Sequence, residues 1–110
     1  MKIFFVYNMT NKWHTVLYTG VTAYLESRGV QHKYKLVEGF TKRYNATKMV
    51  DAKYYPSALE ASATEKRIKG WTRKKKIALI ESVNSEWKDI LDDHVIVHLD
   101  VLRNSNQEVA

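Results

Sequence analysis

The sequence predicts a protein of the α/β (α+β) class, a small three-stranded antiparallel sheet flanked by helices in the order β-β-α-β-α-α. Three stretches rich in β-branched and aromatic residues predict the strands, and the first two are close enough in sequence to form a hairpin. After the third stretch, Ser57 and Thr72 each stand where a helix N-cap is expected. The 110 residues leave room for one domain.

The hairpin consists of predicted strands at residues 2–8 and 15–21. The first strand has apolar side chains on both faces, which is typical of a central strand covered on both sides. We expect the hairpin to be symmetric about the 12–13 peptide bond. This register places Tyr7 directly opposite Tyr18.

A helix is expected next, capped by Thr22 and running to about residue 33. On it Tyr24, Arg28 and His32 are spaced i, i+4 and i+8, so the three side chains share one face.

The middle of the chain contains a loop, a strand and a second helix. Residues 39–45 are polar and basic, and we expect a loop there. The third strand spans residues 49–55 and ends at Pro56, the only proline. Ser57-Ala58-Leu59-Glu60 is a capping box that opens a helix, and Gly70 ends it.

A third helix is expected from Thr72, its cap, through Ser82, and Ser85 is a candidate cap for a short fourth one. Residues 1–92 then form the domain. Residues 93–110 form an acidic C-terminal extension, either a strand or disordered.

The charge is distributed unevenly along the chain. Residues 1–80 carry 16 basic and five acidic side chains, a net charge of +11, whereas residues 81–110 carry a net charge of −5. The segment 66–76 holds seven cations and no acid. Such a field attracts a polyanion, and we expect a nucleic acid, DNA rather than RNA, although a solvated basic helix face is the alternative. The basic residues expected to contact it are Lys42, Arg43, Lys66, Lys69, Arg73, Lys74 and Lys75.

Several classes of function are excluded by composition. The chain has no cysteine, so disulfide frameworks, thiolate zinc sites and cysteine nucleophiles are ruled out. No glycine-rich phosphate loop, dinucleotide fingerprint or His-Glu-x-x-His motif is present. The apolar N-terminal stretch is too short for a signal peptide and no run approaches a membrane span, so we expect a cytoplasmic protein without a membrane partner. Its oligomeric state stays open.

One carboxylate is a candidate metal ligand. Glu65 shares a helical stripe with Ala61 and Ile68, so it leans towards the apolar side of its helix. A carboxylate in that position needs a partner. An ion pair with Lys69, a hydrogen bond to a buried tyrosine and a bound cation all remain open.

An ordered series of motifs connects these residues. It consists of Phe5-Val6-Tyr7, Tyr18-Thr19-Gly20, Leu25-Glu26-x-Arg28-x-x-x-His32 and Glu65-Lys66-Arg67-Ile68-Lys69-Gly70-Trp71. The series resembles the GIY-YIG nuclease superfamily over about residues 2–90. It is most similar to the small stand-alone bacterial members, which are themselves similar to the N-terminal nuclease domain of the excision-repair endonuclease C subunit.

The resemblance implies a role for each residue. Tyr7 and Tyr18 would flank the scissile phosphate, and one of them would help to activate the attacking water. Arg28 would stabilise the negative transition state, with His32 beside it. Glu65 would hold one divalent cation, Mg²⁺ or Mn²⁺.

Asn84 would be a supporting polar residue. The function implied is a metal-dependent endonuclease that hydrolyses phosphodiester bonds in DNA, with a role in repair or recombination.

Two other functions remain open. Tyr24 stands where these relatives usually have an aspartate, and Ser27 and Gly29 interrupt their usual sequence around Arg28. A nucleic-acid-binding module on the same fold, with little catalysis, would fit such changes. A protein-interaction domain with a basic docking face is the third possibility.

Overall fold

The computed structural model describes residues 3–90, so the predicted extension at 93–110 lies outside the described residues. The elements are β1 (Phe4–Thr10), β2 (Leu17–Thr22), α1 (Leu25–Lys33), α2 (Phe40–Arg43), β3 (Lys48–Tyr55), α3 (Ala58–Lys69) and α4 (Arg73–Val83). The predicted fold class and element order are confirmed, with the short helix α2 as an addition.

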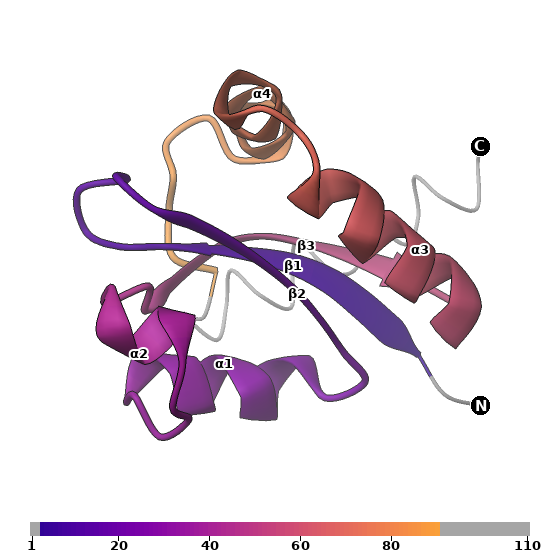
Figure 1. The fold of residues 1–110 in the computed structure, drawn as a ribbon, viewed down its shortest axis with the longest axis horizontal. Helices are drawn as coiled ribbons and strands as arrows, with labels where there is room; N and C mark the ends of the chain where they lie inside the picture. Colours follow the sequence, from indigo (N-terminus) through magenta and orange to yellow (C-terminus); the bar gives the residue numbers. More distant parts are fainter. Residues whose placement is uncertain (1–2, 91–110) are drawn as a thin grey trace.

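The sheet is antiparallel and has the strand order β2-β1-β3. The most apolar strand, β1, is therefore central, as predicted. Figure 1 shows α1 and α2 on one face of the sheet and α3 and α4 on the other. Because β2 lies at an edge of the sheet that residues 3–90 form, groups from helices on both faces of the sheet can approach its side chains.

The hairpin register differs from the expected one. Tyr7 pairs with Gly20, and Tyr18 pairs with Met9. The reason lies in the loop, where Asn11 accepts a hydrogen bond from the backbone N–H of Thr15 and donates one to its hydroxyl. This loop shifts the pairing by two residues. A shift of two leaves every side chain on the same face, so the two tyrosines still lie together.

The start of α1 also differs from the prediction. The helix begins at Leu25, and the Thr22 hydroxyl accepts a hydrogen bond from the N–H of Tyr24 rather than from a helical residue. Thr22 therefore closes a turn before the helix and does not cap it. The helix nevertheless continues through Gly29, which is buried.

The segment 39–45 was expected to be a loop but contains α2. The chain enters this helix at Gly39, whose φ of +128° is a conformation that favours glycine. Nothing lies within 4 Å of where a Cβ of Gly39 would be, so backbone conformation alone calls for glycine there. The helix has only four residues, too few to leave a periodic signal in the sequence.

The two helices after β3 begin as predicted. The Ser57 side chain accepts hydrogen bonds from the N–H groups of Leu59 and Glu60, and Thr72 accepts one from Lys75. The expected helix after Ser85 is absent from the described residues. A turn takes its place, in which the side chain of Asn84 accepts from the N–H of Lys88.

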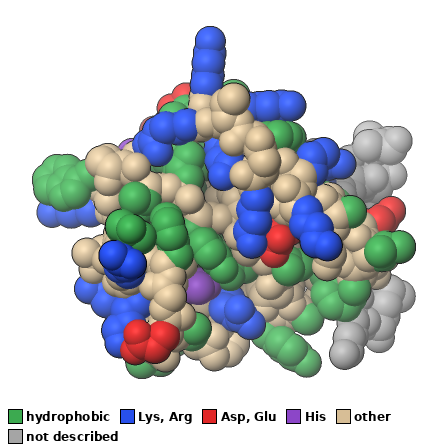
Figure 2. Space-filling view, viewed as in Figure 1, with side chains coloured by type: hydrophobic (Ala, Val, Ile, Leu, Met, Phe, Trp, Pro, Cys, Tyr) green, Lys and Arg blue, Asp and Glu red, His purple; other side chains and the backbone are tan. Residues whose placement is uncertain are grey.

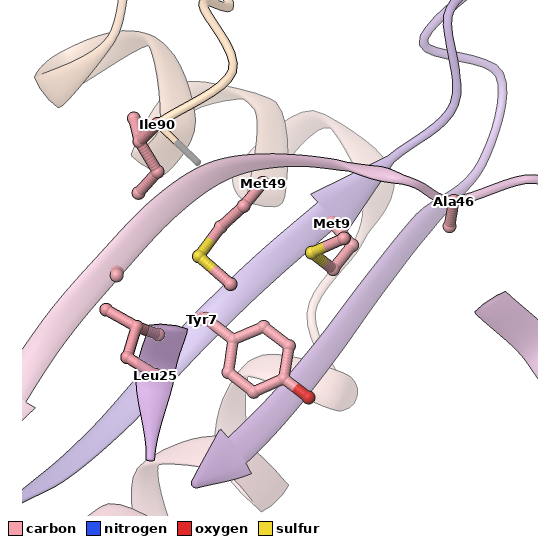
Figure 3. Close-up of a cluster of buried hydrophobic side chains, with 7 residues drawn as sticks. Tyr7, Met9, Leu25, Ala46, Met49 and Ile90 are labelled. Atoms are coloured by element: carbon pink, nitrogen blue, oxygen red, sulfur yellow. The ribbon is translucent and has the colours of Figure 1, made fainter. Parts of the chain in front are cut away.

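The core is divided by the sheet. On the side of α1, one cluster contains Tyr7, Met9, Leu25 and Met49, all buried, and Figure 3 shows the two methionine side chains next to the Tyr7 ring. On the other side, Val6 packs with residues of α3. Within residues 3–90, no helix combines the length and apolar character needed to cross a membrane.

A row of buried polar side chains crosses all three strands. The Thr19 hydroxyl donates to the Asn8 side-chain oxygen at 2.6 Å, and the Asn8 amide donates to the Asp51 carboxylate at 3.0 Å. All three residues are at most 2% exposed. Asn8 in the central strand therefore connects both edge strands through its side chain.

Replacing this amide is expected to destabilise the fold. Asn8→Ala removes the buried hydrogen bonds that the amide makes with Thr19 and Asp51, so the free energy of unfolding should fall by about 1–3 kcal/mol. Chemical denaturation measures this change. Gln31→Ala is the control, because it removes an amide side chain on α1 that lies outside this row. Equal losses in the two variants would contradict the role assigned to Asn8.

Candidate active site

Three rings meet on the α1 side of the sheet. The ring centroids are 6.3 Å apart for Tyr7 and Tyr18, 5.7 Å for Tyr7 and His32, and 5.8 Å for Tyr18 and His32. Strands β1 and β2 supply the tyrosines and α1 supplies the histidine. The structure thus brings together three of the residues predicted for the site.

Gly20 makes room for this arrangement. A Cβ atom at Gly20 would lie 2.5 Å from both Cζ and the hydroxyl oxygen of Tyr7. The Tyr7 ring therefore crosses β2 in the space that any other residue at position 20 would fill. This contact explains why a glycine follows Tyr18 after one intervening residue.

His32 is hydrogen-bonded through both ring nitrogens. Its Nε2 lies 2.9 Å from the Tyr7 hydroxyl, and its Nδ1 lies 2.8 Å from the Thr41 hydroxyl. The histidine is only 4% exposed. Thr41 was not predicted as part of the site, because nothing in the sequence marks one polar residue of a polar segment as buried.

Burial sets the protonation of this pair. Burial raises the pKa of Tyr7, Tyr18 adds to the rise, and Arg28 opposes it. Burial and then Arg28 lower the pKa of His32. At neutral pH Tyr7 therefore keeps its proton and the imidazole is uncharged. A neutral imidazole donates through one nitrogen and accepts through the other, so Tyr7, His32 and Thr41 form a continuous hydrogen-bonded chain.

Arg28 lies beside this group. It is half-buried on α1 and acts electrostatically on both Tyr7 and His32. Tyr24 was expected on the same helix face, but it precedes the helix and is 69% exposed. The guanidinium thus supplies positive charge next to the tyrosines.

Glu65 approaches from the opposite face of the sheet. Its side chain on α3 is 16% exposed, and its carboxylate lies 3.4 Å from Nζ of Lys69. The same ammonium group lies 5.9 Å from the centre of the Tyr18 ring. Lys69 therefore joins Glu65 to the tyrosines around the edge of β2, and the ion pair considered from the sequence is present.

Comparisons with known proteins identify the family of this chain. The family model described as the GIY-YIG catalytic domain matches residues 3–78. The chain belongs to the GIY-YIG family. Its fold is similar to the solution NMR structure of a UPF0213 protein from Bacillus halodurans, with a TM-score of 0.51 and 24% identity over 79% of this chain and 92% of that one. No curated protein matches the sequence closely enough to count as a relative.

GIY-YIG nucleases generally use divalent metal ions. In the part of the chain that the structure describes, no three His, Asp or Glu side chains cluster as a ready metal site. The donor set at Glu65 is one largely shielded carboxylate, with an ammonium group that is itself half-exposed and able to move away. This set fits Mg²⁺, which often takes one carboxylate and completes its octahedron with water and phosphate oxygens.

Asn84 lies at the end of α4, where its side-chain bonds to residues of the described range go to the backbone. Its amide donates to the carbonyls of Val50 and Lys88, and its oxygen accepts from the N–H of Lys88. These bonds attach the turn after α4 to β3. Asn84 thus holds backbone segments together.

The basic residues predicted to bind nucleic acid occupy two regions. Figure 2 shows lysine and arginine side chains gathered over α3 and α4, and a smaller group over α2. Lys66, Lys74 and Lys75 are exposed, and Lys75 lies 4.5 Å from the Trp71 ring centre. Arg73 instead donates to the backbone carbonyls of the hairpin loop. Lys42 and Arg43 lie on α2.

The close approach at Gly20 gives a test of the GIY-YIG site. Gly20→Ala forces the Tyr7 ring away from His32, and we expect the free energy of unfolding to fall by about 1–3 kcal/mol, as for other overpacked cores. NMR of the His32 ring nitrogens should show the loss of the Tyr7 bond. Gly70→Ala is the control, because a Cβ there meets its nearest atom at 3.5 Å. An unchanged His32 spectrum in Gly20→Ala would contradict the proposed contact.

His32 predicts a dependence of stability on pH. Its pKa in the folded protein is below the usual 6.5, so below that pH the unfolded chain binds more protons and stability falls. We therefore expect the free energy of unfolding to decrease between about pH 7 and pH 5. His32→Gln should be less stable at pH 7 but less sensitive to pH.

Denaturation curves at several pH values measure both effects. His14→Gln, in the hairpin loop, is the control. Its free energy of unfolding should retain the part of the pH dependence that His32 supplies. The same pH slope in wild type and His32→Gln would refute this assignment.

Proposed function

We propose that this GIY-YIG protein is a metal-dependent endonuclease that hydrolyses phosphodiester bonds in DNA. The observation that carries the proposal is the convergence of Tyr7, Tyr18 and His32 at the edge of β2, joined to Glu65 through Lys69. The resemblance to the excision-repair nuclease domain supports a role in DNA repair or recombination.

The scissile phosphate would lie between the two tyrosines. Hydrolysis builds negative charge on the non-bridging oxygens and on the leaving 3′ oxygen. Arg28 would stabilise this charge, because its guanidinium acts on Tyr7 and offers several N–H donors. The hydroxyl groups of the tyrosines would orient the phosphate and the attacking water.

Tyr7 with a raised pKa is a poor base by itself. It can accept a proton from water only while it passes its own proton to Nε2 of His32, 2.9 Å away. His32 is suited to receive this proton because it is neutral. Its Nδ1 would then donate to Thr41, which keeps the ring oriented. The water proton would end on Tyr7 and the Tyr7 proton on His32, while the hydroxide oxygen bonds to phosphorus. The bond from phosphorus to the 3′ oxygen breaks, and that oxygen keeps the electron pair and takes a proton from solvent.

Glu65 would hold the divalent cation, with Lys69 released from the carboxylate. When bound, such a cation neutralises charge on phosphate oxygens and lowers the pKa of a bound water.

A second candidate is a nucleic-acid-binding module with little catalysis. The specific observation in its favour is that Lys69 already neutralises Glu65. Such a module would show steeply salt-dependent binding to DNA without turnover, because each phosphate contact releases counterions.

The Glu65 carboxylate distinguishes the two functions. Glu65→Gln keeps the size of the side chain but removes its charge, and we expect cleavage of labelled DNA in Mg²⁺ or Mn²⁺ to fall by about 100-fold or more, as when other electrostatic groups of active sites are removed. Binding measured with the metal chelated should change far less. Glu60→Gln is the matched control, since Glu60 is an exposed carboxylate on the same helix.

Equal cleavage by wild type and Glu65→Gln would eliminate the metal-dependent mechanism. Binding without any cleavage by the wild type would favour the module.

A further inference from the structure

A line of aromatic rings leads from the candidate active site onto α2. Phe40 stacks on Tyr18 with ring centroids 5.9 Å apart and an interplanar angle of 24°. Tyr44 packs against Phe40 at 4.7 Å. We call Tyr18, Phe40 and Tyr44 the aromatic ladder. Neither Phe40 nor Tyr44 belongs to the group of residues that the sequence predicted for catalysis.

The two outer rings of the ladder are partly exposed to solvent. Phe40 is 42% exposed and Tyr44 is 43% exposed. Both line an open hollow of about 770 Å³, together with Glu38, Lys42 and Arg43. Two adjacent, half-exposed rings in one hollow offer apolar surface that the fold itself does not cover, which is typical of a binding site.

The hollow is also positively charged. Its lining contains two basic side chains, Lys42 and Arg43, and one acidic side chain. That acid, Glu38, is paired with Lys42 at 2.5 Å. The guanidinium of Arg43 lies 5.5 Å from the centre of the Tyr44 ring. An apolar aromatic surface is thus combined with a net positive charge.

This combination fits one ligand chemistry in particular. Aromatic rings beside cations bind single-stranded nucleic acid, because bases stack on the rings while the cations contact the phosphates. A duplex hides the faces of its bases in its own stack and exposes them only at an end. The ladder therefore favours unpaired bases over paired ones.

We infer that the aromatic ladder binds unpaired bases of a single-stranded DNA segment next to the scissile phosphate. The position beside the phosphate rests on the proposed nuclease function, because the ladder begins at Tyr18. The substrate class is then DNA with an unpaired region at the cleavage site, and Phe40 and Tyr44 determine that specificity.

The structure holds the ladder in a defined place. Thr41, between its two outer residues in α2, is buried and hydrogen-bonded to His32. Gly39 sets the direction in which the chain enters α2. The rings are therefore oriented before a ligand arrives, which reduces the entropy lost on binding.

The test compares binding of single-stranded and duplex DNA of one sequence, with the metal chelated so that no cleavage occurs. Tyr44→Leu removes a ring but keeps an apolar side chain, and we expect the Kd for single-stranded DNA to rise about tenfold, the effect of losing one base–ring stack. The Kd for the duplex should change about twofold or less, within the range of a surface substitution. A fluorescent adenine analogue in the single strand should be quenched by the wild type and less so by Tyr44→Leu.

Two further variants control for folding and for general surface effects. Tyr44→Phe keeps the ring and should bind single-stranded DNA like the wild type. Tyr34→Leu makes the same change at a tyrosine that is 66% exposed and outside the ladder, and should leave binding unchanged. Thermal unfolding of each variant verifies that it is folded.

The inference is overturned if Tyr44→Leu leaves single-stranded binding unchanged, or weakens duplex binding equally. It is also overturned if RNA of the same sequence binds more tightly than DNA and depends on Tyr44 in the same way. Cleavage assays separate this result from the proposed function. Binding of single-stranded DNA that depends on the Tyr44 ring, without any cleavage, would contradict the nuclease function and support the base-binding surface. Cleavage of DNA at a rate that does not depend on Tyr44 would support the nuclease function and contradict the base-binding surface.

Discussion

The Tyr7 ring lies across β2 at Gly20, in the volume that a Cβ would occupy, and the whole site is arranged around that contact. It fits only if β1 and β2 pair in the observed register. With the ring in this place, its hydroxyl reaches His32 on α1. His32 in turn reaches Thr41, so α2 is connected to the sheet through two side chains. A close packing between two strands therefore positions two helices and, with them, every group on this face of the site.

Local signals in the sequence were sufficient for much of the fold. Ser57 and Thr72 cap their helices through bonds to N–H groups only two or three residues away, and such contacts can be predicted from spacing. The hairpin register was not predictable in the same way. It depends on how the Asn11 side chain closes a six-residue loop, and several loops would satisfy the same strand pattern. The prediction of which side chains share a face of the sheet was still correct, because a shift of two residues leaves each side chain on the same face.

The candidate site, like the fold, could be predicted only in part from the sequence. That Tyr7 and His32 lie near Tyr18 followed from an ordered set of motifs. The roles of Thr41 and Arg73 could not be predicted from the sequence, because each depends on a tertiary contact. Thr41 is buried against His32, and Arg73 is bonded to carbonyls of a loop almost sixty residues earlier in the chain. Side chains of this kind look identical in sequence to solvent-exposed neighbours, since only the fold decides which of them finds a partner.

Within residues 3–90, the strand that carries the site, β2, is paired with another strand on only one side. The outer row of backbone N–H and C=O groups of such a strand is a template on which another copy of the chain can add a strand. In this protein, Nζ of Lys69 on α3 lies 5.9 Å from the centre of the Tyr18 ring on that strand, and further basic side chains gather over α3 and α4 (Figure 2). Two copies that approach edge to edge therefore bring like charges together and repel each other, whereas a polyanion is attracted. The same positive charge would thus attract a polyanion and disfavour edge-to-edge pairing of two copies, and salt weakens both electrostatic effects.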